Sequence, residues 1–263
     1  MIIIQPSGGL CNRMRVINSA WILAQKKNCK LLVLWKMCDE LNCPFEELFL
    51  PPKEFPIINF KSNFNIKKLF YQFTAKQRFQ NEDIENNKTD GILHTEFFNR
   101  LSTSCYIFTW EHFYQANDYH LFVPTASLTK RIDEIAKNFG EHSVGVHIRR
   151  TDNTWAIANS KSDEFSIAIR KELKQFPDAK FYLATDDITE EERLRKEFGD
   201  AIVSNTGKTL ARDSVEGMHD ALIDLFCLSR TNKIFGSFYS SFTDIAADMR
   251  GIEKIVVGKT NES

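Results

Sequence analysis

The second half of the chain alternates short apolar segments with segments of helical periodicity, and this alternation limits the fold more than any other feature. Strands are expected at residues 142–148, 180–184, 201–204, 233–236 and 254–257. Apolar residues recur every three or four positions between them, which predicts helices at 163–175, 189–198, 214–229 and 240–249. Strands that alternate with helices pair in parallel, so this half predicts a parallel sheet covered on both faces.

The first 35 residues show the same arrangement once. An apolar strand is expected at residues 2–5, followed by a turn at Ser7-Gly8-Gly9. Residues 12–28 have helical spacing, and residues 30–35 form a second apolar strand. This pattern predicts a βαβ unit with a right-handed crossover.

The stretch from residue 36 to about residue 115 has weaker patterns. It is rich in Phe, Asn and Lys, and we expect only a helix at 66–78 and a strand at 105–110. A further helix is expected at 125–139, ended by Gly140. The fold class is therefore predicted as α/β with two Rossmann-like domains, an N-terminal domain at 1–139 and a C-terminal domain at 140–263.

Composition excludes several classes of protein. The 263 residues carry 34 Lys and Arg against 35 Asp and Glu, a balance unlike that of a general nucleic-acid binder. The six cysteines form no CxxC pair and no zinc-binding spacing, which fits a reducing compartment. No signal-peptide pattern and no apolar run of about 18 residues occurs, so we expect a cytoplasmic protein without a membrane span.

The segment that carries most chemistry is His147-Ile-Arg-Arg-Thr-Asp152, directly after an expected strand. Ligands of open parallel sheets bind at the carboxyl ends of the strands. The guanidinium of Arg matches phosphate oxygens with two parallel hydrogen bonds. We therefore interpret the segment as a site for a phosphate or diphosphate, against the alternative of a solvated strand end with a surface Arg–Asp pair.

Three further segments follow expected strands or lie on expected helices. Thr185-Asp186-Asp187 comes after the next strand, as carboxylates that orient the arginines or as a helix cap. Asp220 and Asp224 are four residues apart on one helix, either as a solvated acidic face or with one of them recognising the donor edge of guanine. Ser240 and Ser241 begin the last helix, as an anion site or as an ordinary N-cap.

Metal and cofactor motifs are absent from the sequence. Thr206-Gly207-Lys208-Thr209 resembles the end of a phosphate-binding P-loop, but Ile202 stands where the first Gly is required. The sequence contains no GxGxxG, HExxH or DxD motif. We expect no metal and no cofactor.

The ordered set of these blocks resembles the fucosyltransferase superfamily that includes α1,2-, α1,6- and protein O-fucosyltransferases. The resemblance rests on the His147 to Asp152 block, residues 182–187, residues 220–229 and residues 236–242, in that order. The Gly8-Gly-Leu-Cys-Asn-Arg13 turn is also similar to a turn of several members. The family implies two facing Rossmann-like domains of the GT-B type, with the active site in the cleft, GDP-fucose as donor and a glycan as acceptor.

The resemblance also implies a role for each site residue. Arg149 would hold the β-phosphate as a catalytic residue, together with Asp152, and His147 would contact the nucleoside. Substrate binding would further involve Arg150, Asp224, Ser240, Ser241, Asn12 and Arg13, with Asp186 and Asp187 in support. The chain departs from the α1,6-type members at the base: residues 153–157 contain no Glu, and the first carboxylates are Asp163 and Glu164.

The expected function is therefore a metal-independent, inverting fucosyltransferase that partners a GDP-sugar donor and a glycan acceptor, but no nucleic acid. Two alternatives stay open. The donor can be another GDP-sugar, because nothing in the sequence identifies the sugar. The chain can also be a non-enzymatic nucleotide- or glycan-binding module, because a phosphate site does not by itself imply turnover.

Overall fold

The computed structural model describes residues 1–115, 119–151 and 154–258 of the chain. It divides the chain into two compact units: residues 1–125 with 211–218, and residues 126–210 with 219–263. The division falls at Ala126, earlier than the boundary expected at 139/140, and residues 211–218 return to the first unit. Asp152 lies outside the described residues.

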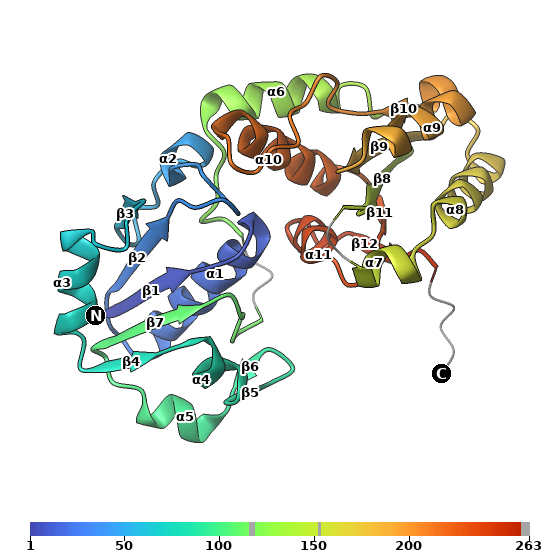
Figure 1. The fold of residues 1–263 in the computed structure, drawn as a ribbon. Coiled ribbons are helices and arrows are strands. Elements are labelled where there is room, and N and C mark those ends of the chain that lie inside the picture. Colours follow the sequence, from blue (N-terminus) through green and yellow to red (C-terminus); the bar gives the residue numbers. More distant parts are fainter. Residues whose placement is uncertain (116–118, 152–153, 259–263) are drawn as a thin grey trace. The chain divides into compact units, whose positions relative to one another are not determined.

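Unit 1 is built on a five-stranded parallel sheet (Figure 1). Its order is β3-β2-β1-β7-β4, and the strands are β1 (Ile2–Pro6), β2 (Leu31–Lys36), β3 (Ile57–Phe60), β4 (Gln77–Phe79) and β7 (Cys105–Thr109). Helix α1 (Leu10–Lys26) connects β1 to β2, as the βαβ pattern predicts. The other elements of this unit are α2 (Phe45–Leu48), α3 (Ile66–Thr74), α4 (Asn81–Glu85), α5 (Thr95–Arg100) and a β5 (Lys88–Thr89) to β6 (Ile92–Leu93) hairpin.

Unit 2 holds a second five-stranded parallel sheet, in the order β10-β9-β8-β11-β12. Its strands are β8 (Ser143–Ile148), β9 (Lys180–Thr185), β10 (Ile202–Val203), β11 (Lys233–Gly236) and β12 (Glu253–Val256). The α-helices are α6 (Ala126–Ala136), α7 (Thr154–Asn159), α8 (Ser162–Gln175), α9 (Ile188–Phe198), α10 (Val215–Ser229, which starts in unit 1) and α11 (Ser241–Asp248). Every strand expected after Gly140 is present, within one or two residues of its expected bounds.

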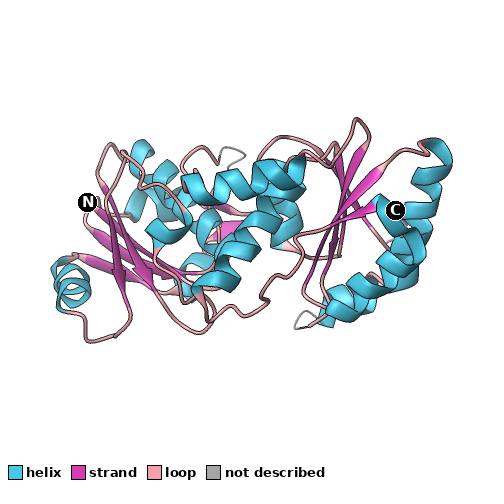
Figure 2. Ribbon diagram, turned by 90° about the horizontal axis from the view of Figure 1, so that it is seen from above, coloured by secondary structure: helices cyan, strands magenta, loops and turns pink. Residues whose placement is uncertain are grey.

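Helices lie on both faces of each sheet (Figure 2). In unit 2, one face packs Phe165 and Ile169 of α8 and Leu194 of α9 against Val144, Val146 and Ile148 of β8 and their neighbours. Strand β8 is buried along its whole length, as a central parallel strand should be. The predicted fold class, α/β with two Rossmann-like units, is confirmed. No helix within the described ranges is both long and apolar enough to cross a bilayer.

Candidate functional site

The sheet of unit 2 changes its winding direction between β8 and β11. From β8 the chain proceeds to β9 and β10 on one side, and then crosses to β11 and β12 on the other. Arg149 follows β8, Ser237 follows β11, and the Arg149 backbone N–H donates to Ser237 Oγ over 3.0 Å. Such a switch point is where open α/β sheets bind ligands. The structure thus places the most informative sequence segment where this topology favours a binding site.

Asp186 organises the loop that follows β8. Its carboxylate accepts hydrogen bonds from the Arg150 backbone N–H at 2.7 Å and from Thr151 Oγ1 at 2.6 Å. It also lies 3.1 Å from Nη1 of Arg149. Burial raises the pKa of Asp186, but the Thr151 hydrogen bond and the Arg149 charge outweigh burial and leave this pKa below its ordinary value. The ionised carboxylate therefore holds the Arg149 guanidinium beside the strand end.

Arg150 points into a different environment from Arg149. Its Nε donates to Ser162 Oγ at 3.3 Å, and its guanidinium lies 5.8 Å from the centre of the Phe165 ring. Burial lowers the pKa of Arg150. Nη2 of Arg150 is buried and has no hydrogen-bond partner among the described residues. This arginine braces the strand-end loop against α8.

His147 is buried against the start of α11. Its Nδ1 lies 2.8 Å from Thr243 Oγ1 and 3.4 Å from Ser240 Oγ, and its ring stacks on Phe242 with the ring centres 4.9 Å apart. Burial, helped by the nearby Arg149 charge, lowers the pKa of His147 to about 3. The imidazole is therefore neutral at pH 7 and acts as a hydrogen-bonding and packing group.

The low pKa of His147 makes the stability of the protein pH-dependent. At pH values between the ordinary pKa of 6.5 and the folded-state pKa of about 3, the unfolded chain binds a proton at His147 and the folded chain does not. The free energy of unfolding should therefore decrease as the pH is lowered through this window, and this residue contributes about 1.4 kcal/mol per pH unit. We expect His147→Asn to flatten the slope by that amount in urea unfolding followed by circular dichroism. An unchanged slope would show that His147 is protonated in the folded protein.

Helix α11 approaches the sheet closely because Gly236 has no side chain. A Cβ at this position would lie 2.2 Å from Cγ2 of Thr243, so a larger residue would displace the helix. Ser240 is the N-cap residue of α11, is buried, and directs its hydroxyl to His147. Ser241 is half-buried in the first turn. The first backbone N–H groups of a helix attract anions, and here they follow β11 at the same sheet edge as Arg149.

Asp220 and Asp224 both lie on α10 and are both buried. Asp224 Oδ1 accepts from the Tyr182 hydroxyl at 2.6 Å, and Oδ2 pairs with Lys208 Nζ at 2.9 Å. Burial raises the pKa of Asp224, and the Lys208 charge opposes that shift. The alternative of a solvated acidic face is wrong for this helix.

Asp220 is equally engaged with its own chain. Its carboxylate accepts from Arg131 Nη2 at 2.7 Å, from Asn205 Nδ2 at 3.1 Å and from the Thr209 backbone N–H at 2.8 Å. The two aspartates therefore fasten residues 205–209 to α10. Lys208, which the sequence offered only as part of an incomplete P-loop, is the partner that neutralises Asp224.

Asp187 has the position of a cap rather than of a ligand. Its Oδ1 accepts the Thr189 backbone N–H at 2.8 Å, and the residue is the N-cap of α9. The hydrogen bonds to the backbone of the arginine segment and the ion pair with Arg149 come from Asp186, whereas Asp187 acts on Arg150 through its charge. Asp152, expected as catalytic, lies outside the described residues.

Asn12 and Arg13 belong to unit 1, at the turn between β1 and α1. Gly8 adopts a φ of +79°, which favours glycine, and Gly9 is the N-cap of α1. Arg13 is 1% exposed. Its Nε donates to the Gly8 carbonyl at 2.7 Å and its Nη1 to the Lys36 carbonyl at 2.5 Å, while its guanidinium lies 4.9 Å from the centre of the Trp35 ring. Burial lowers the pKa of Arg13, and the side chain ties the turn before α1 to the end of β2.

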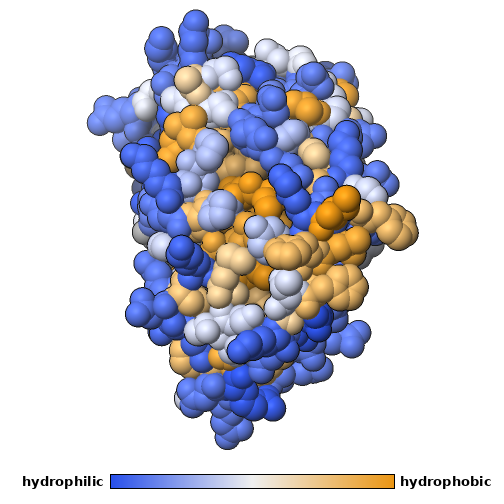
Figure 3. All heavy atoms as spheres, turned by 90° about the vertical axis from the view of Figure 1, so that its left-hand side faces the viewer, coloured by the Kyte–Doolittle hydropathy of each residue, from blue (hydrophilic) through white to orange (hydrophobic). Residues whose placement is uncertain are grey.

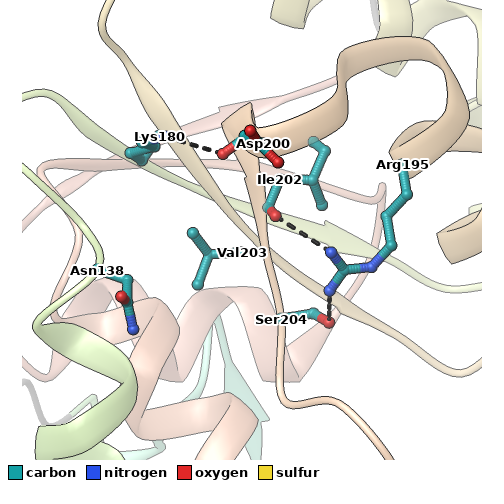
Figure 4. A pocket seen from close by; sticks show the side chains of 7 residues that line it. All are labelled: Asn138, Lys180, Arg195, Asp200, Ile202, Val203 and Ser204. Atoms are coloured by element: carbon teal, nitrogen blue, oxygen red, sulfur yellow. Dashed lines mark hydrogen bonds between the residues drawn. The ribbon is translucent and has the colours of Figure 1, made fainter.

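A hollow of about 310 Å³ at the β10 edge of unit 2 is a weaker candidate (Figure 4). The cations that line it form hydrogen bonds within the protein. Lys180 Nζ donates to the Asp200 carbonyl at 2.9 Å, and Arg195 donates to Ser204 Oγ and to the Ile202 carbonyl. It lies on the outermost strand, away from the β8–β11 switch point. Across the described ranges, no cluster of three His, Cys, Asp or Glu residues could hold a metal ion.

Comparison with known proteins gives structural matches only. No family model and no curated protein matches the chain. NodZ α-1,6-fucosyltransferase soaked with GDP-fucose matches with a TM-score of 0.66 and 19% identity, over 94% of this chain and 92% of that chain. The structure of NodZ from Bradyrhizobium matches with a TM-score of 0.65 and 19% identity, over 93% of this chain and 91% of the other.

POFUT1 in complex with GDP-fucose matches with a TM-score of 0.61 and 13% identity, over 98% of this chain and 97% of that chain. These proteins and the present chain share a fold over nearly their whole lengths. The chain thus shares the fold of these NodZ and POFUT1 structures, as the ordered sequence blocks led us to expect.

Proposed function

We propose that the protein is a glycosyltransferase that moves fucose from GDP-fucose to a hydroxyl of a glycan acceptor. The observation that carries the proposal is the position of Arg149 at the β8–β11 switch point, where Asp186 holds its side chain. The N-terminus of α11 begins at the same edge of the sheet, after β11. A diphosphate fits these groups because the arginine fork and the helix N-terminus both bind phosphate oxygens. The shared fold with NodZ and POFUT1 structures that contain GDP-fucose supports GDP-fucose as the donor.

The proposed chemistry needs stabilisation of the leaving group. When the bond from the sugar to the β-phosphate breaks, negative charge builds on GDP and the sugar takes on oxocarbenium character. Arg149 would meet this charge together with Ser240, Ser241 and the first N–H groups of α11. An acceptor hydroxyl attacking from the opposite face of the sugar inverts the anomeric centre, with Asp152 among the candidate carboxylates for its proton. We also propose that the sugar transfer does not require a metal ion.

Donor binding in this proposal uses His147 on the nucleoside side and Asp224 for guanine, with Arg150 and Asp186 holding the loop. The burial of Arg13 favours a structural role for this side chain, so in unit 1 the half-buried Asn12 remains the stronger candidate contact. The described cysteines form no disulfide, which supports the cytoplasm as the proposed location.

A donor screen read as sugar-nucleotide hydrolysis tests the proposal without knowledge of the acceptor. We expect release of GDP from GDP-fucose, little release of UDP or ADP from the corresponding sugar nucleotides, and no effect of EDTA. Hydrolysis of GDP-mannose in preference to GDP-fucose would favour another GDP-sugar as donor. If the protein bound GDP but neither hydrolysed any donor nor transferred sugar to any of a panel of glycans, a non-enzymatic module would be favoured instead.

A further inference from the structure

Helix α3 directs its apolar side chains away from the protein. Ile66, Phe70 and Phe73 follow one another at helical spacings of four and three residues, and they are 83%, 60% and 71% exposed. Phe64, just before the helix, is 86% exposed. Figure 3 shows apolar side chains gathered on the side of unit 1 where α3 lies in Figure 1. We call these four residues, with the cations that flank them, the α3 surface.

The opposite side of α3 carries a mixed, weakly apolar face. Leu69 and Tyr71 are half-buried, and Tyr71 packs against the core cluster of unit 1, but Lys68 and Gln72 are half-buried as well, and no residue of the helix is fully buried. A surface helix of a globular protein normally turns its apolar stripe inward and its polar residues outward. In α3 the most hydrophobic stripe faces outward, so packing within the unit does not explain it.

Local contacts stabilise both ends of α3. The Asn65 side chain caps its N-terminus by accepting the Lys68 backbone N–H at 3.1 Å. At the other end, Arg78 donates to the carbonyls of Gln72 and Phe73, both at 2.7 Å. A nine-residue helix is marginal by itself in water. These caps therefore secure a helix that presents apolar residues to its surroundings.

The charged residues of the segment that contains α3 all have one sign. Residues 61–80 contain Lys61, Lys67, Lys68, Lys76 and Arg78, and no Asp or Glu. This segment is strongly basic in a chain whose net charge is only −1. Exposed Phe and Ile beside Lys and Arg are the composition of helices that lie in a membrane interface. The lysine stems can run along apolar surface while their ammonium groups reach the headgroups.

We propose that the α3 surface docks the protein onto a bilayer rich in anionic phospholipid. In the docked state α3 would lie along the interface, with Phe64, Ile66, Phe70 and Phe73 among the upper acyl chains. The exposed Lys61, Lys67 and Lys76 would face phosphate groups. A second copy of the chain is a poor occupant, because a symmetric pairing of this surface with itself would oppose two groups of cations. This inference does not depend on the proposed function.

Co-sedimentation with vesicles tests the proposal on the full chain. We expect binding to vesicles of phosphatidylcholine with phosphatidylglycerol, little binding to phosphatidylcholine alone, and weaker binding at high salt. Phe70→Gln with Phe73→Gln should reduce the vesicle partition coefficient at least tenfold, because two apolar anchors are lost. Lys61→Ser with Lys67→Ser should also reduce it roughly tenfold, on anionic vesicles alone.

The matched control is Ile167→Gln with Ile188→Gln, which removes two apolar side chains of unit 2 that are 60% and 63% exposed. This control should bind vesicles like the unchanged protein, and circular dichroism should show that all variants fold. Absence of binding to anionic vesicles would overturn the proposal. So would equal loss in the control, or a dimer that Phe70→Gln with Phe73→Gln dissociates, since a dimer would make this surface a protein interface.

Discussion

Arg149→Ala should reduce turnover of GDP-fucose by about 10²- to 10³-fold, the usual cost of removing one preorganised group that stabilises developing charge. The side chain is 21% exposed and forms an ion pair with Asp186, which keeps hydrogen bonds from Arg150 and Thr151 after the substitution. The fold should therefore survive. Arg149→Lys should recover only part of the activity, because an ammonium group lacks the two-pronged geometry. Steady-state kinetics of donor hydrolysis gives both values.

Arg170→Ala is the control for the Arg149 experiment. Arg170 is an exposed arginine of α8 that pairs with Glu197 of α9. Its loss changes the net charge of the protein by the same amount and should leave kcat and KM unchanged. Near-normal activity of Arg149→Ala would remove Arg149 from the phosphate site. A parallel loss in Arg170→Ala would point to a general effect of charge.

The sheets were predictable where strands are apolar and helices are long. From residue 142 onward the pattern predicted each strand, because β8, β9 and β11 are largely apolar and the helices α8, α9, α10 and α11 run for two turns or more. The six-residue helix α7 was not expected. In residues 36–115 the elements are short: α2 has four residues, α4 five, α5 six and β4 three. Patterns that short carry little periodic signal. The expected helix at 66–78 ran past the end of α3 at Thr74 and into β4.

The site was predictable only where the backbone position determined it. Strand ends of a parallel sheet share one edge, so His147, Arg149 and the serines before α11 could be grouped from sequence order. Side-chain pairing across loops left no such signal. Ser237, which meets the Arg149 backbone, and Thr243, which meets His147, were not singled out. Arg13 of α1 is buried, although an arginine is ordinarily exposed, because it donates to the carbonyls of Gly8 and Lys36 and lies over the Trp35 ring.

The pair formed by Asp224 and Lys208 should be the most sensitive point of unit 2. Their side chains are 9% and 7% exposed, and the pair is completed by the Tyr182 hydroxyl. Lys208→Met removes one partner and leaves a buried carboxylate, which should cost about 3–5 kcal/mol of unfolding free energy. Adding Asp224→Asn should restore most of that loss, because the double variant buries no unpaired charge. Urea unfolding of the single and double variants measures both effects, and equal stability of Lys208→Met and the unchanged protein would show that the pair is solvated.

The double variant also decides whether Asp224 recognises guanine. A carboxylate has about four acceptor positions, so the hydrogen bond from Tyr182 and the contact with Lys208 leave capacity for the N1–H and NH₂ of guanine. We expect the unchanged protein to bind GDP roughly 10- to 100-fold more tightly than UDP or ADP, since those bases lack this paired donor edge. Lys208→Met with Asp224→Asn should remove most of that preference while the protein stays folded, as titration calorimetry with the three nucleotides would show. If the double variant kept the preference for GDP, Asp224 would serve only to hold residues 205–209 against α10, and another group would read the base.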